Sequence, residues 1–158
     1  MDTTAVMRKQ MVIQFQVDRY NNKLIEQMRK LLDETKIAGS KMEKSQIGNL
    51  LEVTTETQSV ELVKNFIQYQ MGRDVGGTSW RSQSFGDRFV KLIDNELRRM
   101  AETVANQVIQ DSGLEHSADI ERQVQDEVWI ELLRQFVGQM NRYFYYQKEA
   151  QRWSKRES

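Results

Sequence analysis

Apolar residues recur along this chain at spacings of three and four, the repeat that marks one face of an α-helix. The most regular stripe runs from Phe85 to Val108, and a second runs from Ile120 to Tyr143. The first helix should end at Gly113, because glycine tolerates the left-handed backbone of a helix end. The second should begin at Ser117, a favourable N-cap. From these two helices we expect six core side chains: Leu97, Met100, Val104, Val128, Leu132 and Phe136.

Three earlier segments also have helical periodicity. Residues 4–38 predict one long amphipathic helix or two, with Met11 and Phe15 in the apolar stripe and Gly39 in the break that follows. Residues 42–53 predict a short helix, ended where Thr54 and Thr55 lower the helix propensity. Residues 59–74 predict a third helix, capped by its first serine.

Composition agrees with a helical chain and excludes several classes of protein. The chain has no proline and eight glycines, too few turn-forming residues for an all-β fold. Together with the periodicity, this predicts an all-α fold, a single antiparallel bundle of about five helices in one domain over residues 1–158. The N-terminal stretch has no long apolar run, so the default expectation is a soluble, cytoplasmic protein without membrane contact.

Residue types needed for catalysis are scarce. There is no cysteine, and the single histidine, His116, lies in a predicted turn, so multi-histidine metal sites are excluded. The stretch Gly72–Ser79 lacks the lysine of a phosphate-binding loop and follows a predicted helix instead of a strand. We therefore expect no catalytic residue, no metal ligand and no cofactor. A hydrolase using helix-borne carboxylates, such as Asp126 with Glu127, is the enzymatic alternative.

The clearest break in the periodic pattern is residues 75–84, rich in glycine, serine and threonine, which predicts an exposed and mobile loop. Trp80 stands beside Arg81 in this loop, a pair able to stack on a base and bind a phosphate. Arg73 and Arg88 flank the loop. The plain alternative is a hydrophilic loop that binds nothing.

Charge is balanced overall but unevenly distributed. The chain has 23 basic and 23 acidic residues, yet residues 111–131 hold seven acidic and one basic residue, and residues 142–156 hold five basic and one acidic. This polarity suits the dipole of the last helix, and it also suits a head-to-tail contact between copies or a polyanion site at the basic end. Lys36, Lys41 and Lys44 form a further small cluster, for which solvated surface is the alternative.

Three stretches, in order, resemble the small helical subunit of type III CRISPR effector complexes of the Csm kind. Lys44–Leu51 is similar to the family's Thr-Ser-Lys-Ile-Arg-Asn-Leu-Leu, although Gln46 and Gly48 stand where the family often has basic residues. Phe66–Asp74 is similar to its Tyr-Gln-x-Gly-Arg-Glu, and Phe136–Tyr146 to its aromatic-rich final helix.

The resemblance implies a non-catalytic subunit, present in several stacked copies, that touches the backbone of guide RNA and target RNA and contacts other subunits of the complex. Combined with the charge clusters, it predicts eight RNA-binding residues: Lys41, Lys44, Arg73, Trp80, Arg81, Arg88, Arg142 and Arg152. Among the loop residues we expect Arg81 to contribute more than Arg73. The alternative function is a helical adaptor that binds protein and has no nucleic-acid role.

Overall fold

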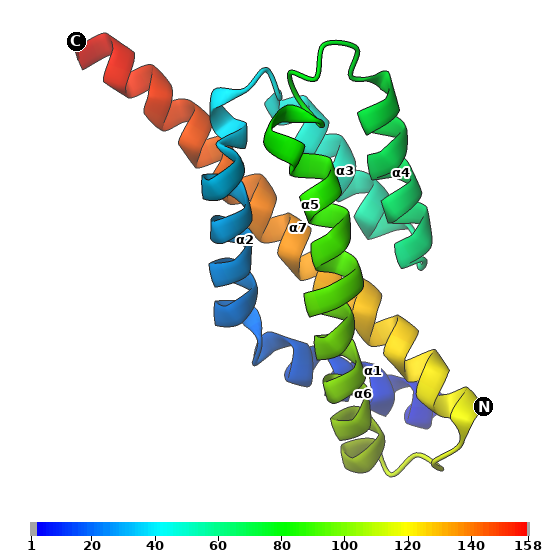
Figure 1. The fold of residues 1–158 in the computed structure, drawn as a ribbon. Helices are drawn as coiled ribbons and strands as arrows, with labels where there is room; N and C mark the ends of the chain where they lie inside the picture. The colour runs from blue at the N-terminus through cyan, green and yellow to red at the C-terminus, as the bar shows by residue number, and fades with distance from the viewer. Residues whose placement is uncertain (1–2, 158) are drawn as a thin grey trace.

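The computed structural model describes residues 3–157, and within this range the chain is helical and contains no strand (Figure 1). The all-α prediction is therefore confirmed. The α-helices in chain order are α1 (Thr3–Asp18), α2 (Asn21–Thr35), α3 (Lys44–Glu56), α4 (Val60–Arg73), α5 (Phe85–Leu92), α6 (Arg98–Ser112) and α7 (Ala118–Glu157). Short 3₁₀ turns, Ile37–Gly39 and Ser82–Ser84, precede α3 and α5.

The predicted division into five helices is not confirmed. Residues 4–38 form two helices, and α1 turns away at the α1–α2 junction to lie across the lower end of the other helices (Figure 1). The left-handed residue at the end of α2 is Lys36, with φ of 52°, instead of the expected Gly39. Its N–H donates back to the carbonyl oxygens of Asp33 and Leu32, which closes the last turn.

The structure confirms three other predicted helix ends, at Ser59, Gly113 and Ser117, and contradicts one, at Thr54. The side chains of Ser59 and Ser117 accept from Leu62 N and Ile120 N at 3.3 and 3.2 Å, and Gly113 is left-handed with φ of 67°, as expected. The predicted stop at Thr54 is wrong, because α3 continues to Glu56. The hydroxyl of Thr54 donates to Leu50 O at 2.7 Å, so the buried side chain stays satisfied within the helix.

The stripe predicted over Phe85–Val108 forms one continuous helical rod with a wider π-helical turn at Ile93–Leu97. A π turn displaces carbonyls from their usual helical partners. The indole Nε1 of Trp129 on α7 donates to Ile93 O at 3.1 Å, which satisfies one of these buried groups. This bond ties the middle of the rod to α7.

Helix α7 spans 40 residues and packs against α2, α3 and α6 (Figure 1). The six predicted core side chains are confirmed, since none is more than 6% exposed. They belong to one continuous cluster of buried apolar residues that extends from Ile13 to Phe144. The prediction fails on α1, where Met11 and Phe15 are exposed and Ile13 and Val17 are buried instead.

Candidate nucleic-acid interface

Segments far apart in the sequence gather their cations at one end of the molecule. The N–H of Lys41 donates to Thr78 O at 2.9 Å, which joins the turn before α3 to the loop before α5. The Lys148 ammonium on α7 donates to Ser40 O at 3.0 Å, which adds the C-terminal helix. We call residues 36–44, 73–84 and 148–156 the basic end; it occupies the upper part of Figure 1.

The loop of the basic end is organised by one buried carboxylate, Asp74. Its two oxygens accept from the backbone N–H groups of Thr78, Ser79 and Arg81 at 3.1, 3.1 and 2.9 Å. Burial by itself would raise the pKa of the Asp74 carboxyl, but these hydrogen bonds outweigh it and hold the pKa below its ordinary value of 3.8. The loop is therefore anchored along its length and not merely a hydrophilic connection.

Trp80 is buried, and the prediction that it stacks on a base is wrong. The residue is 1% exposed, and its ring packs against Phe66 and Phe85 with centroid distances of 6.3 and 6.0 Å. The N–H of Gly86 donates to Trp80 O at 2.8 Å, which fixes the backbone as the indole enters the core. The Asp74 network turns the chain inward, so the largest apolar side chain of the loop fills the gap between α4 and α5.

Arg81 stays at the surface but its guanidinium is occupied. Its Nη2 and Nε donate to the carbonyl oxygen of Asp74 at 2.7 and 3.2 Å. Arg73, in the last turn of α4, is exposed and lies over the ring of Tyr69 at 5.5 Å. Both cations are accessible to a phosphate, and Arg81 would have to share its donors between the loop and a ligand.

A second group of charges lies where α3 meets α7. Lys44 forms an ion pair with Glu149 and lies 4.0 Å from the ring centroid of Tyr145. Arg152 contacts the same carboxylate at 3.3 Å. The hydrogen bond from Lys44, together with the nearby Arg152, holds the pKa of Glu149 below its ordinary value. Because two cations share one carboxylate, this group keeps a positive charge.

Lys41 is exposed, and its ammonium has no hydrogen-bond or ion-pair partner within residues 3–157. Within the basic end it is, with Arg73, a predicted RNA-binding residue whose charged group is exposed and makes no hydrogen bond or ion pair among the described residues. Lys36, which the sequence groups with Lys41 and Lys44, also belongs to the basic end. So does Lys148, which was not among the predicted RNA-binding residues. Burial lowers the pKa of Lys148, and the neighbouring Lys44 lowers it further while Glu43 opposes both.

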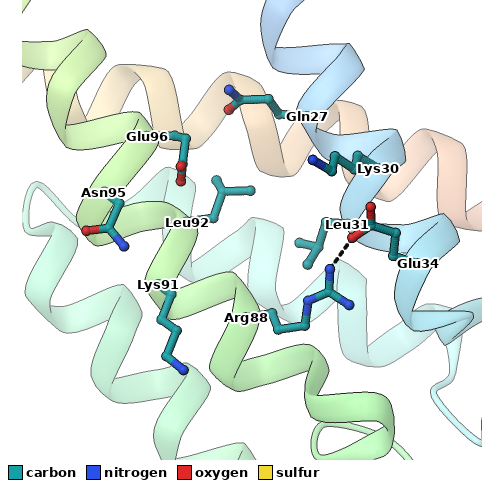
Figure 2. A pocket seen from close by; sticks show the side chains of 9 residues that line it. All are labelled: Gln27, Lys30, Leu31, Glu34, Arg88, Lys91, Leu92, Asn95 and Glu96. Atoms are coloured by element: carbon teal, nitrogen blue, oxygen red, sulfur yellow. Dashed lines mark hydrogen bonds and ion pairs between the residues drawn. The ribbon is translucent and has the colours of Figure 1, made fainter.

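Arg88 and Arg142 lie away from the basic end. Arg88 forms an ion pair with Glu34 across the α2–α5 groove (Figure 2). This groove encloses about 370 Å³, and Lys30, Lys91 and Glu96 lie along it as well, so both charge signs line it. Arg142 is exposed on α7, about three turns before Arg152. The Arg88 charge is paired with Glu34, and neither residue belongs to the three segments of the basic end.

The sequence reasoning missed Asp74, the residue that shapes the loop. The signal available was an aspartate directly after a helix and before Gly-Gly-Thr-Ser, since aspartate side chains commonly accept from backbone N–H groups a few residues on. His116 is exposed as expected, with its Nε2 3.3 Å from Glu121. No group of three metal-binding side chains occurs in the part of the chain that the structure describes.

Comparison of this chain with protein-family models, curated proteins and solved structures gives no match. No helix within residues 3–157 has the length and apolar character needed to cross a membrane.

Proposed function

We propose that this chain is a non-catalytic, multi-copy small subunit of a type III CRISPR RNA-guided effector complex, and that its basic end binds the RNA backbone. The observation that carries the proposal is the convergence of cations from three distant segments on one end of a neutral molecule. Lys41, Arg81 and Arg152 come from the turn, the loop and α7, respectively. A local positive field of this kind attracts a polyanion without a global excess of charge.

The contacts would be with phosphates and ribose rather than with bases. Trp80, the aromatic side chain of the loop, is buried and cannot stack on a nucleotide. The cations of the basic end lie on turns and on a helix end, where flexible side chains can follow a phosphate backbone. Contacts of this type carry no sequence information, which suits a subunit that must accept any guide and any target.

The resemblance supports the same proposal from the sequence side. Its three stretches lie on α3, α4 and α7, and these helices pack against one another. The first stretch buries Ile47 and Leu50, the second buries Ile67, and the third buries Phe136 and Phe144. The similar stretches therefore build one packing unit, and the second of them ends at the aspartate that shapes the loop.

The test is charge reversal at an exposed cation of the basic end, Lys41→Glu, measured as affinity for an RNA duplex of arbitrary sequence at two salt concentrations. We expect weaker binding and a salt slope reduced by about 0.7–0.9, the value for one lost phosphate contact. The matched control is Arg99→Glu, an exposed cation on α6 outside the basic end. Equal affinity and equal slope for Lys41→Glu and Arg99→Glu would remove the basic end from the RNA path.

Arg81 requires a milder change because its guanidinium also supports the loop. Arg81→Gln removes the charge and retains an N–H donor for the Asp74 carbonyl. We expect a smaller loss of RNA affinity than for Lys41→Glu, with the unfolding temperature unchanged. Full RNA affinity of the Arg81→Gln variant would assign Arg81 a structural role alone.

The proposal also expects no nuclease, phosphatase or nucleotide-hydrolysing activity of the purified protein with Mg²⁺ or Mn²⁺. Turnover that follows the protein through purification and disappears on Ala replacement of a carboxylate pair, such as Asp126 with Glu127, would contradict it and favour the hydrolase alternative.

A second candidate function is an adaptor that binds protein and has no nucleic-acid role. It is favoured by the apolar side chains that α1 exposes, Met7, Met11 and Phe15, which are 61%, 71% and 64% accessible. Binding of a protein partner with no measurable RNA affinity, alone or in the assembled complex, would favour the adaptor.

A further inference from the structure

Helix α1 carries an apolar strip that faces away from the core. Met7, Met11 and Phe15 follow one another at intervals of four residues and thus lie on one face of the helix. With Thr4, Arg8, Val12 and Asp111 they line an open groove of about 640 Å³. We call Met7, Met11 and Phe15 the α1 strip. Contiguous apolar side chains this exposed mark an interaction surface.

The contacts of α1 with the rest of the molecule keep the strip outward. Lys9 pairs with Glu127 on α7 at 2.9 Å, and Gln16 donates to Asp111 on α6 at 2.7 Å. Ile13 and Val17 are buried on the same side as these polar contacts. Rotating α1 to bury the strip would break both polar contacts and expose the two buried residues.

The opposite end of the molecule has a second exposed apolar surface. The last helical residues whose exposure is described, 151–156, are all exposed, because α7 continues past its last contacts with the turn before α3 (Figure 1). Trp153 is 50% and Tyr146 57% exposed, and their rings meet edge to face at 6.2 Å. We call residues 151–156 the α7 tail.

The two surfaces are complementary in charge and in chemistry. The α7 tail has three basic residues and no acidic one. The groove of the α1 strip has one cation, Arg8, and one anion, Asp111. It also lies at the C-terminal end of α6, where helix carbonyls add partial negative charge, and the adjoining segment 111–131 has seven acidic residues and one basic. Methionine sulfur also packs favourably on aromatic rings, so Met7 and Met11 suit a tryptophan.

We infer that the α1 strip of one copy receives the α7 tail of a second copy, with Trp153 as the anchor. An amphipathic helix end in an apolar groove is a common recognition mode, and here the basic residues around the anchor face the acidic surroundings of the groove. Because the two surfaces are different and lie at opposite ends, the contact is head to tail and repeats from copy to copy. This inference deepens the multi-copy part of the proposed function and rests on it.

The first experiment follows the mass of the purified protein by sedimentation up to a concentration of about 1 mM, where even a weak contact is populated. We expect mass to grow with concentration for the wild-type chain, and at least a tenfold weaker association for Met11→Glu and for Trp153→Glu. The matched control is Leu62→Glu, an equally exposed apolar residue on α4, which should associate like the wild type. All three positions are exposed, so circular dichroism and thermal unfolding should match the wild type.

Mixing the two defective variants identifies the geometry. Met11→Glu retains an intact tail, and Trp153→Glu retains an intact strip, so together they should form a one-to-one complex that grows no further. A wild-type chain that stays monomeric, a variant that associates normally, or a mixture that stays monomeric would each overturn the inference. A symmetric contact between two α1 strips would instead respond to Met11→Glu alone.

RNA affinity separates this inference from the proposed function. If assembly depends on the strip and the tail while Lys41→Glu leaves RNA affinity unchanged, the RNA proposal fails and the head-to-tail contact stands. If Lys41→Glu weakens RNA binding while Met11→Glu and Trp153→Glu associate normally, the contact fails alone. Trp153→Glu adds a negative charge within the basic end, so the effect of assembly on RNA affinity is measured with Met11→Glu, whose substitution lies at the opposite end of the molecule.

Discussion

The loop before α5 and the α7 tail contain the same sequence feature, a tryptophan next to an arginine, and the fold treats the two in opposite ways. In the loop, Trp80 is 1% exposed and Arg81 is bonded to the chain itself. In the tail, Trp153 is 50% exposed and follows Arg152, whose guanidinium contacts Glu149 one turn earlier. Neighbouring residues in the sequence therefore do not decide whether such a pair is available to a ligand.

The difference arises from what the surrounding backbone needs. The loop leaves several N–H groups without helical partners, and a buried carboxylate, Asp74, collects three of them and thereby turns the indole inward. In the tail, the backbone N–H groups are satisfied within α7, and the helix continues after the elements that could cover it have ended. A tryptophan that is far from any partner helix remains in solvent.

The largest expected effect tests this comparison directly. Trp80→Ala should reduce the free energy of unfolding by about 3–5 kcal/mol, because it removes a large buried side chain from between α4 and α5. Trp153→Ala should change the same quantity by less than about 0.5 kcal/mol, as expected for an exposed position. Chemical denaturation of both variants at a concentration where the protein is monomeric checks the pair. Equal losses would show that the two tryptophans are not in different environments.

Asp74→Asn tests the carboxylate that turns the loop. The free energy of unfolding should fall by about 1.5–3 kcal/mol at neutral pH, because charge-assisted hydrogen bonds to the loop N–H groups are weakened and one is lost. Denaturation at neutral pH measures the loss. Asp119→Asn, which changes an exposed carboxylate in the first turn of α7, is the control and should cost less.

The pH dependence of the wild-type protein provides a second test of Asp74. Its pKa in the folded state lies below the ordinary value of 3.8, so the unfolded chain binds the proton more readily. The stability from Asp74 should be fully present above that ordinary value and should be lost as the pH falls through the lowered pKa of the folded state. Asp74→Asn should lack this part of the acid dependence, and an identical acid profile for the two proteins would contradict the role given to Asp74.

Gly86→Ala sharpens the comparison at the point where the loop meets α5. A Cβ at this position would lie 2.7 Å from two atoms of Met71 and 2.9 Å from the backbone oxygen of Trp80. We expect a loss of about 1–3 kcal/mol in the free energy of unfolding, because the Trp80 backbone must move. Gly138→Ala is the matched control within α7, where a Cβ meets nothing within 4 Å, and it should instead add about 0.5–1 kcal/mol. Thermal or chemical unfolding distinguishes the loss of stability expected for Gly86→Ala from the gain expected for Gly138→Ala.

The sequence by itself determined the helical class, the long helices and most of their inner faces. Periodicity suffices there because a helix that packs on one side must repeat its apolar residues every three or four positions, as Leu97, Met100 and Val104 do. Caps such as Ser59 and Ser117 are equally local, since the side chain bonds to a backbone group three residues away. These features depend on short-range geometry and can be predicted from neighbouring residues.

The tertiary structure decided which side of α1 is buried, where Trp80 lies and which cations share one surface. On α1 the apolar residues surround the helix, so ion pairing of Lys9 with Glu127, more than 100 residues away, selects the buried face. The N–H of Lys41 reaches the loop through its hydrogen bond to Thr78 O. The Lys148 ammonium reaches the turn before α3 through its hydrogen bond to Ser40 O. Such contacts join positions far apart in the sequence, and no local pattern encodes them, because their energy exists only once the helices have packed.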